Sequence, residues 1–288
     1  MPEPAADAAN AAMRRYWNEV AGPRWVGRQA VQELRNVEMA EQLLAAAAAQ
    51  PGERVLDIGC GTGVTTLPYA RAVGPSGHVT GVDISQPMLA AAERRVAESG
   101  LGNVTLLLAD AQVHPFPPAE FDLLTSRLGV MFFANPLAAF RNLFPALRRG
   151  GRLCMAVWAA LDENTHWQIP YGIALRHLGP PAPKPPHAPG PFAFGDRDYL
   201  RGILAASGFA EIAIEPRRFH IHGETAAAMA EHVGLFGAVQ QLMDEKGADA
   251  ATREAIVRET EAAFAPYVGE GGVRLPATFL LVTASRPG

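Results

Sequence analysis

The chain has 288 residues, of which 49% are hydrophobic and 19% charged, a composition typical of a globular protein with a sizeable core in one large or two small domains. Its formal net charge of −4 at pH 7 and its lack of long Lys/Arg runs exclude the electrostatic pattern of a nucleic-acid-binding surface. With two cysteines and no apolar run of transmembrane length, the sequence predicts a cytoplasmic protein without a disulfide framework or a membrane partner.

The first 50 residues are rich in alanine and helical in pattern, and they do not begin with the basic and apolar stretches of a signal peptide. Ala21-Gly22-Pro23 predicts a break between one helix and a second helix that runs from Val26 to Ala49. Tyr16 and Trp25 lie on either side of this break. Such aromatic side chains either line a ligand site or anchor a helix to the core, and the sequence leaves both possibilities open.

Residues 51–158 alternate between short apolar runs and helical segments, which is the pattern of a parallel sheet covered by helices on both faces. The helix after Asn135-Pro136 is expected to kink or to end early at Pro145. Its apolar face consists of Leu137, Phe140, Phe144 and Leu147. Five strands are expected, at residues 53–58, 78–82, 103–108, 120–126 and 151–158.

The first of these strands leads into a glycine-rich loop, Asp57-Ile58-Gly59-Cys60-Gly61-Thr62-Gly63. Glycines at alternate positions allow a sharp turn from strand to helix and let a ligand lie against bare backbone. The next strand ends at Asp83, where nucleotide-binding βαβ units place an acid that accepts hydrogen bonds from ribose hydroxyls. The two features together predict a nucleotide-like cofactor at this edge of the sheet.

The third and fourth strands also end in polar residues. Asp110-Ala111 follows the third strand, and Ser126, Arg127 and Met131 lie at the end of the fourth. Because ligands of open parallel sheets lie beyond the carboxyl ends of the strands, these residues are candidates for the same site. Asp110 could instead cap a helix or be a solvated loop acid. Arg127 could bind a carboxylate of the cofactor or of a second substrate, or pair with a structural acid.

The composition changes after residue 158. A segment dense in proline, 180–191, can form neither a helix nor a central strand, and we expect a stiff surface segment or a flap. Trp167 and Tyr171 precede this segment and are well placed to line a pocket. The remaining elements are expected to be a helix near 197–207, a strand near 209–219, helices over 224–265 and a last strand at 277–284.

Three histidines raise the question of a metal site or a general base. His220 and His222 are spaced to share one face of a strand, but no cysteine or third ligand stands at a matching spacing, so no metal is expected. His166 is a weak candidate for a general base because it lies in the insert beside Trp167. No G-x-S-x-G elbow or P-loop lysine supports hydrolase or kinase chemistry.

Taken together, these motifs resemble the class I S-adenosylmethionine-dependent methyltransferases. The pattern D-x-G-x-G-x-G from Asp57 to Gly63 differs from the G-x-G-x-x-G of dinucleotide-binding dehydrogenases. The resemblance implies S-adenosyl-L-methionine as the cofactor and an α/β fold with a doubly wound, seven-stranded, mostly parallel sheet. It places the last strand antiparallel beside the fifth. It also implies one methyltransferase domain over 1–288, with a helical lid at 1–50, a cofactor-binding core at 51–158, and acceptor-site insertions and the C-terminal strands at 159–288.

The resemblance also implies roles for single residues. Asp57 lies near the amino group of the cofactor, Asp83 binds the ribose, and Asp110 binds the adenine amino group beside the backbone amide of Ala111. The full cofactor-binding set that it implies is Asp57, Gly59, Cys60, Gly61, Gly63, Asp83, Ile84, Met88, Asp110, Ala111, Ser126 and Arg127. The acceptor-binding candidates are Tyr16, Trp25, Met131, Trp167 and Tyr171.

The segment from Ser126 to Phe133 resembles the Ser-Arg-x-Gly-x-Met-Phe-Phe stretch of many bacterial small-molecule methyltransferases. The chain is more distantly similar to the ubiquinone and menaquinone C-methyltransferases, which carry an Arg-Asn pair where Met131-Phe132 stand here. This difference argues against a quinone acceptor.

The resemblance therefore predicts methyl transfer from S-adenosylmethionine to a carbon, oxygen or nitrogen atom of a small organic acceptor, by a monomer or a homodimer. Such a reaction depends on in-line alignment and exclusion of water more than on covalent chemistry, and no catalytic residue beyond the weak candidates His166 and Arg127 can be assigned. Two alternatives stay open, a nicotinamide-dinucleotide oxidoreductase and a protein that binds S-adenosylmethionine without methylating.

Overall fold

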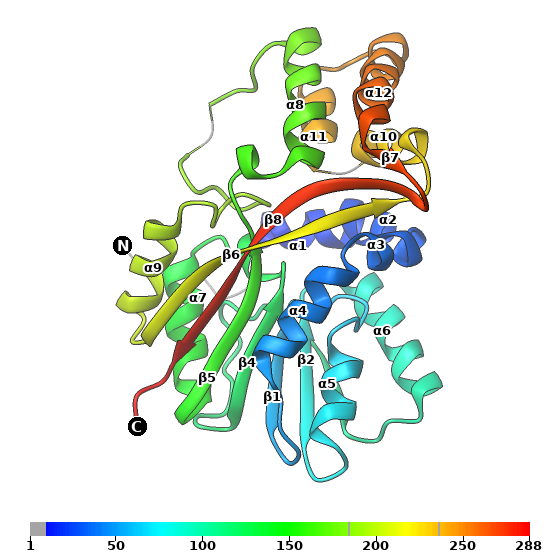
Figure 1. The fold of residues 1–288 in the computed structure, drawn as a ribbon. Coiled ribbons are helices and arrows are strands. Elements are labelled where there is room, and N and C mark those ends of the chain that lie inside the picture. The colour runs from blue at the N-terminus through cyan, green and yellow to red at the C-terminus, as the bar shows by residue number, and fades with distance from the viewer. Residues whose placement is uncertain (1–9, 184, 236) are drawn as a thin grey trace.

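The computed structural model describes residues 10–183, 185–235 and 237–288 and has a central sheet with helices on both faces (Figure 1). Five strands run parallel in the order β3-β2-β1-β4-β5. Next to β5 lies β8, which is antiparallel both to β5 and to the edge strand β6. The bounds are β1 Arg54–Ile58, β2 His78–Asp83, β3 Val104–Leu108, β4 Phe121–Arg127, β5 Leu147–Trp158, β6 Ala210–Gly223 and β8 Gly272–Ser285.

This arrangement confirms the expected fold class, including the antiparallel last strand beside the fifth. One further strand was not expected. β7 (Val268–Gly269) has only two residues and pairs with the start of β8, so its sequence is too short to carry an alternating pattern.

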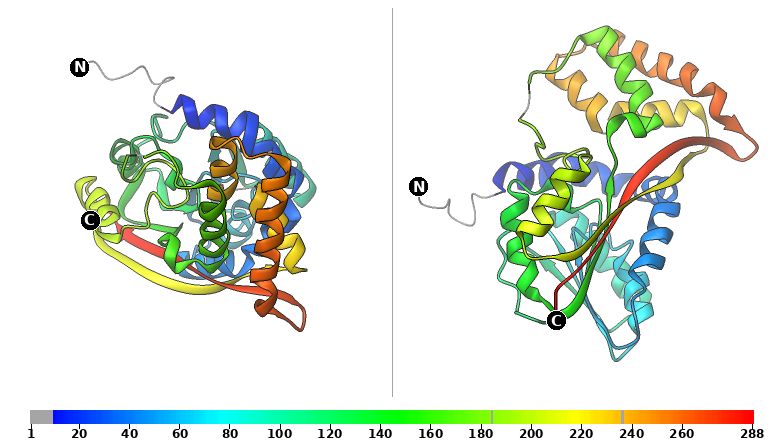
Figure 2. Two further views of the ribbon diagram at one scale, coloured as in Figure 1. Left: turned by 90° about the horizontal axis from the view of Figure 1, so that it is seen from above. Right: turned by 60° about the vertical axis from the view of Figure 1, so that its left-hand side comes forward.

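Helices cover the sheet on both sides, with α4, α5 and α6 on one face and α7 and α9 on the other (Figures 1 and 2). Several of these helices begin at residues that are typical of helix N-termini. The Asn135 side chain accepts a hydrogen bond from the backbone N–H of Ala138 at the start of α7, and Pro87 lies in the first turn of α6. The bounds are α4 Val37–Ala47, α5 Thr66–Val73, α6 Gln86–Ser99, α7 Pro136–Leu143 and α9 Arg197–Ala206.

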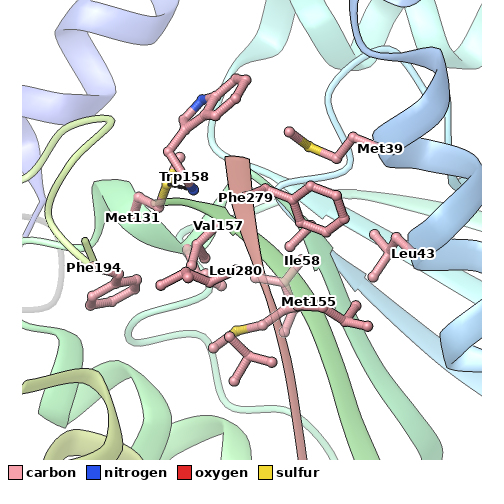
Figure 3. Close-up of a cluster of buried hydrophobic side chains, with 14 of the residues drawn as sticks. Met39, Leu43, Ile58, Met131, Met155, Val157, Trp158, Phe194, Phe279 and Leu280 are labelled. Atoms are coloured by element: carbon pink, nitrogen blue, oxygen red, sulfur yellow. Dashed lines mark hydrogen bonds between the residues drawn. The ribbon is translucent and has the colours of Figure 1, made fainter. Parts of the chain in front are cut away.

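The hydrophobic core is one cluster that includes side chains on both faces of the sheet. Figure 3 shows part of it, where Ile58, Met155 and Phe279 of the strands lie near Met39 and Leu43 of α4, and all five side chains are buried. Central strands that are covered on both faces bury successive residues rather than alternate ones. For this reason they appear in the sequence as continuous apolar runs.

The N-terminal helices differ from expectation. Ala21-Gly22-Pro23 does not break the helix, because a π-helix at Tyr16–Val20 runs directly into α2 (Ala21–Gly27). The π-turn shifts the backbone hydrogen-bond register, which leaves Pro23 in the first turn of α2, where a missing N–H costs little. The preceding helix is α1 (Ala11–Arg15).

The prediction of a single helix from Val26 to Ala49 is also wrong. The chain leaves helical geometry at Arg28 and again at Asn36, where φ is −127° and −113°. These two interruptions separate α2, α3 (Gln29–Arg35) and α4, so that three short helices take the place of one long one.

The helical stripe expected over 137–147 is shorter than predicted. As Pro145 indicated, α7 ends at Leu143, and a 3₁₀ turn follows at Phe144–Ala146. Leu147 is already the first residue of β5, and so it packs into the core from a strand rather than from a helix.

Four helices form a second layer beyond the sheet, which we call the cap: α8 Thr165–Leu178, α10 Ala226–Leu235, α11 Gly237–Glu245 and α12 Ala250–Phe264. β6 and β8 extend past the sheet as a long two-stranded ribbon that leads to α10–α12 (Figure 1). The described residues of the proline-dense segment form neither helix nor strand, as expected. Within the ranges described, no helix is long and apolar enough to cross a membrane.

Candidate functional site

A cavity of about 210 Å³ lies where the N-terminal helices, the carboxyl ends of the central strands and the cap meet. Its walls come from three separate stretches of the chain. They are formed by Asn10, Met13, Tyr16, Trp17, Ala21, Trp25, Gln32, Arg35, Asn36; by Ile58, Gly59, Cys60, Gly61, Thr62, Thr65, Val82, Asp83, Ile84, Met88, Ala109, Asp110, Ala111, Arg127, Leu128, Gly129, Met131, Phe132, Phe133; and by Trp158, His166, Trp167, Pro191, Ile221, His232, Val233, Gly237, Gln241.

The glycine-rich loop forms one wall with its backbone. Gly59 and Gly61 have φ values of +66° and +56°, a left-handed conformation that other L-residues rarely adopt. A Cβ atom on Gly59 would lie 2.7 Å from the Cα of Gly129, so only glycine lets these two loops touch. Cys60 between them is buried, and burial raises the pKa of its thiol well above the usual value, which keeps it protonated.

Asp83, at the end of β2, reaches across to this loop. Its Oδ2 accepts a hydrogen bond from the Gly61 N–H at 2.7 Å, and its Oδ1 accepts one from the Ser85 N–H at 2.8 Å. Burial raises the pKa of Asp83 to about 6, although the two backbone donors oppose this shift. The carboxylate therefore orients the loop and also faces the cavity.

Asp110 lines the cavity after β3. Its Oδ1 accepts hydrogen bonds from the Gln112 N–H at 3.0 Å and from Asn10 Nδ2 at 3.5 Å. Its Oδ2 is buried and has no hydrogen-bond partner among the described residues. A buried carboxylate oxygen without a donor is costly unless a ligand supplies one, which favours a binding role for Asp110 over a simple cap.

Asp57 lies behind the glycine loop and does not line the cavity. Its Oδ2 accepts hydrogen bonds from the hydroxyls of Thr65 and Thr66, at 2.8 and 2.7 Å. Burial raises the pKa of Asp57, and the positive charge of Arg127 acts in the opposite direction. Within the described part of the chain, its Oδ1 has no hydrogen-bond donor.

The end of β4 separates two of the predicted residues. Arg127 lines the cavity, whereas Ser126 points back into the core and donates a hydrogen bond to the Ile58 carbonyl at 2.7 Å. The Ser126 hydroxyl also accepts the Gly129 N–H at 3.3 Å, so it holds the loop after β4 against β1. Leu128, between Ser126 and Gly129, lines the cavity and has a φ of +65°, which is unusual for a residue other than glycine.

Aromatic side chains form most of the opposite wall. Trp17 packs edge-on against Phe132, with ring centroids 4.9 Å apart, and against Trp25. A Cβ atom on Gly237 would lie 1.9 Å from the ring of Trp167, so this glycine of α11 lets the indole approach the backbone closely. This half of the cavity is apolar and suits a ring-bearing molecule.

His166 lies among these rings and is 3% exposed. Its ring centroid is 5.1 Å from that of Trp158 and 5.4 Å from that of Trp167. Burial lowers the pKa of His166 well below its usual value, and the charge of Arg35 adds to this effect. The imidazole is therefore neutral and only weakly basic near pH 7.

The N-terminal helices are held over the cavity by hydrogen bonds to the segment that follows β2. Ser85 Oγ donates a hydrogen bond to the Trp17 carbonyl at 2.9 Å, and Asn18 Nδ2 donates one to the Ile84 carbonyl at 3.0 Å. The Gln86 N–H in turn donates to Asn18 Oδ1 at 2.9 Å. Gly22 permits this close approach, because a Cβ atom there would lie 2.6 Å from Ser85 Oγ.

Most of the predicted site residues meet at this cavity. From the cofactor set, the lining includes Gly59, Cys60, Gly61, Asp83, Ile84, Met88, Asp110, Ala111 and Arg127, and from the acceptor set Tyr16, Trp25, Met131 and Trp167. Asp57, Gly63, Ser126 and Tyr171 do not line the cavity. The pKa of Tyr171 is raised by burial and by the charge of Glu245 on α11. His220 and His222 lie elsewhere. His222 pairs with Glu38 of α4 at 2.6 Å, and in the described ranges no group of three His, Cys, Asp or Glu side chains could hold a metal.

The lining also contains polar residues that were not predicted, among them Gln32, Arg35, His232 and Gln241. A signal for two of them exists in the sequence. Gln32 and Arg35 extend, at helical spacing, the buried stripe of Met39, Leu43 and Ala47. Polar residues at positions that should face the core indicate a site rather than a solvated surface.

The site fits S-adenosylmethionine. The bare backbone at Gly59 and Gly61 lets a ligand approach closely, and Asp83 and Asp110 present carboxylates to the cavity on adjacent strand ends. The unpartnered Oδ2 of Asp110 can accept a hydrogen bond from an amino group, and Arg127 offers a positive charge at the same end.

Comparisons with known proteins agree with this geometry. Residues 55–151 match the family model described as a methyltransferase domain. The chain is 31% identical over 201 residues to the nocamycin O-methyltransferase of Saccharothrix syringae, a match that covers 67% of this chain and 70% of that protein. It is also 34% identical over 131 residues to a demethylmenaquinone methyltransferase of Listeria monocytogenes, which covers 46% of this chain and 55% of that protein.

Solved structures show the same fold. The Haemonchus contortus phosphoethanolamine N-methyltransferase 2, in complex with phosphomonomethylethanolamine and S-adenosylhomocysteine, superposes with a TM-score of 0.54 at 19% identity. The match covers 87% of this chain and 53% of that one. With the relative from Saccharothrix, the matching domain and a cavity of this composition, the chain belongs to the class I S-adenosylmethionine-dependent methyltransferases.

Proposed function

We propose that the enzyme transfers the methyl group of S-adenosylmethionine to a carbon, oxygen or nitrogen atom of a small organic acceptor bound among Trp17, Trp25, Phe132 and Trp167. The observation that carries this proposal is the continuity of the cavity. One lining joins the glycine loop and the two strand-end carboxylates to an apolar, aromatic half that the cofactor features do not require. A single continuous space allows acceptor and cofactor to meet without water between them.

In this proposal Asp83 binds the ribose, Asp110 and the Ala111 backbone bind the adenine, and Arg127 offers its charge to the cofactor's carboxylate. The cofactor supplies an electrophilic methyl group. The chain supplies alignment and exclusion of water, while the N-terminal helices act as a lid over the bound pair. His166 is too weak a base to draw a proton from an acceptor with a high pKa, so the main contributions are proximity and desolvation.

The relatives do not fix the acceptor. One is named for O-methylation of nocamycin and another for methylation of demethylmenaquinone, so related chains serve different atoms and different molecules. Membership of the methyltransferase family sets aside the alternative of a nicotinamide-dependent oxidoreductase. The division into lid, core and insertions, the cytoplasmic location, the monomeric or dimeric state and the absence of nucleic-acid partners stay predictions.

The test is a screen of ring-bearing acids, phenols and amines with S-adenosylmethionine, read out as S-adenosylhomocysteine by mass spectrometry. We expect product that depends on both acceptor and enzyme, and a fall in acceptor kcat/KM for Trp167→Ala with unchanged affinity for S-adenosylhomocysteine. A folded enzyme that binds S-adenosylhomocysteine but gives no methylated product with any acceptor would contradict the proposal.

A further inference from the structure

Arg35, at the end of α3, is a buried cation in the wall of the cavity. It is 5% exposed, and its Nη1 donates a hydrogen bond to the thioether sulfur of Met229 on α10 at 2.7 Å. No carboxylate of the described residues lies within ion-pair distance of its guanidinium. Two other arginines show the reverse pattern, pairing and greater exposure. Arg152 and Arg95 pair with Glu53 and Glu33, and both of these arginine side chains are more exposed, at 33% and 27%.

Among the described residues, no negative charge lies close enough to Arg35 to compensate it. Burial lowers its pKa to about 10, and no acid in the described ranges opposes this shift. Its titratable neighbours are His166 on α8 and His232 on α10. Burial lowers the pKa of both imidazoles, that of His232 to about 2, and the charge of Arg35 adds to the effect. Both imidazoles are therefore neutral near pH 7. Gln32 donates a hydrogen bond to His232 at 3.4 Å and adds no charge.

A buried guanidinium without a carboxylate costs folding free energy, because the desolvation of the charge is not offset. Unlike a surface arginine, it cannot recover this cost from water. The guanidinium presents five N–H donors in a plane that matches a carboxylate, and one bond to a sulfur atom leaves most of them available. An uncompensated cation that lines a cavity is thus suited to a ligand that supplies the missing negative charge.

Two arginines face this cavity, and their neighbours distinguish them. Arg127 interacts electrostatically with Asp57 behind the glycine loop and with Glu33, which places it at the cofactor end. Arg35 instead contacts Met229 and acts on His166 and His232, all of which belong to the cap. Trp167 of the aromatic wall and the neighbouring Trp158 also adjoin His166.

We propose that the methyl acceptor is an organic anion, a ring-bearing molecule with a carboxylate, and that Arg35 is the residue that binds this carboxylate while the aromatic wall holds the rings. The proposal rests on the methyl-transfer function proposed above, since it assigns the cap side of the cavity to the acceptor.

The experiment compares 2-naphthoate with 2-naphthamide, which has the same rings and nearly the same shape but no charge. Calorimetry measures both affinities in the full-length enzyme, with and without saturating S-adenosylhomocysteine. We expect 2-naphthoate to bind about tenfold more tightly or better, the effect of charge-assisted hydrogen bonds in a buried site. In Arg35→Met this preference should disappear, while the affinity for S-adenosylhomocysteine stays within about threefold of the wild-type value.

Arg28→Met is the matched control. Arg28 follows α2, acts on His232 electrostatically and does not line the main cavity, so this variant removes a nearby charge without touching the site. It should keep the preference for 2-naphthoate. The melting temperature of Arg35→Met should equal or exceed that of the wild type, since the variant removes an uncompensated buried charge. If Arg35 had a purely structural role, Arg35→Met would instead have a lower melting temperature than the wild type.

Three outcomes would overturn the proposal: equal affinities for the two naphthalene compounds in the wild type, a preference that survives in Arg35→Met, or a tenfold loss of S-adenosylhomocysteine affinity in that variant. The last result would assign Arg35 to the cofactor. The proposed methyl-transfer function can fail independently of the anion site. An enzyme that prefers 2-naphthoate through Arg35 but methylates no acceptor would keep the anion site and contradict methyl transfer. An enzyme that methylates only neutral acceptors would support methyl transfer and contradict the anion site.

Discussion

At the scale of single residues, Asp83 combines two tasks that differ in their pH dependence. Its carboxylate accepts the N–H groups of Gly61 and Ser85, and it faces the proposed ribose position. Its pKa in the folded protein, about 6, lies above the ordinary value of 3.8, so the native state binds the proton more readily than the unfolded state. The contribution of this group to folding is therefore greatest below pH 3.8 and is lost as the pH rises through about 6.

Ligand binding should follow the opposite trend, because the ionised carboxylate is the better acceptor for ribose hydroxyls. We expect the affinity for S-adenosylhomocysteine to rise between pH 5 and 7, through the pKa of about 6. Asp83→Asn should lower the affinity at pH 7.5 by about ten- to a hundredfold, or roughly 1.5–3 kcal/mol, and should flatten the profile. Calorimetry across this range checks both. A profile that keeps its slope in Asp83→Asn would assign the titration to another group, such as Asp57.

At the scale of elements, the packing of α1 and α2 on the core depends on Gly22. A methyl group there would lie 2.0 Å from the Trp17 carbonyl oxygen and 2.6 Å from Ser85 Oγ, so Gly22→Ala must displace the helices from the Ser85 region. If these helices form the lid, turnover should fall severalfold while the melting temperature changes little, because the sheet does not depend on them. Hydrogen exchange should show faster exchange at 11–27.

Gly27 provides the matched control for this change. It lies in the same helix, and a Cβ atom there meets nothing within 4 Å. Gly27→Ala should therefore keep wild-type turnover and wild-type exchange. In the unmodified enzyme, S-adenosylhomocysteine should slow exchange at 11–27, since a lid closes over its ligand. Equal exchange with and without the ligand would mean that these helices are a fixed part of the fold.

The elements that the sequence predicted well are those with local causes. β1 and β4 are largely buried and contain the apolar runs Val55-Leu56 and Leu123-Leu124, and Pro145 ends α7 because its ring cannot continue the helix. The predictions were wrong where the local structure depends on residues far away in the sequence. The π-turn at Tyr16–Val20 is held by the core at Ile84-Ser85-Gln86, which no local pattern reveals.

The same distinction applies to the site. The glycine loop and Asp83 could be found because one backbone turn and one strand end define them. Arg35 and His232 are almost 200 positions apart, and their proximity depends on the contact of α3 with α10. Ser126 was assigned to the cavity because strand ends usually face it, but its hydroxyl is bound to the Ile58 carbonyl instead.

At the scale of the whole molecule, the ligand should stabilise lid, core and cap together, because all three line one cavity. At a concentration about 100 times its dissociation constant, S-adenosylhomocysteine should add about 2.7 kcal/mol to the free energy of unfolding. For a chain of this size the melting temperature should rise by roughly 5–10 °C. Differential scanning fluorimetry checks this, with NAD as the control. A comparable shift with NAD would contradict the selectivity argued from Asp57 to Gly63.

The ribbon of β6 and β8 has a consequence for how such an enzyme can diversify. The helices between Gly223 and Gly272 leave and re-enter the sheet through these two antiparallel strands, outside the matched segment 55–151 that binds the cofactor in our proposal. Evolution could lengthen, shorten or replace that excursion without altering the strand order. Enzymes of this kind could then acquire new acceptors by exchange of this one helical segment, while the part of the chain that binds the methyl donor stays unchanged.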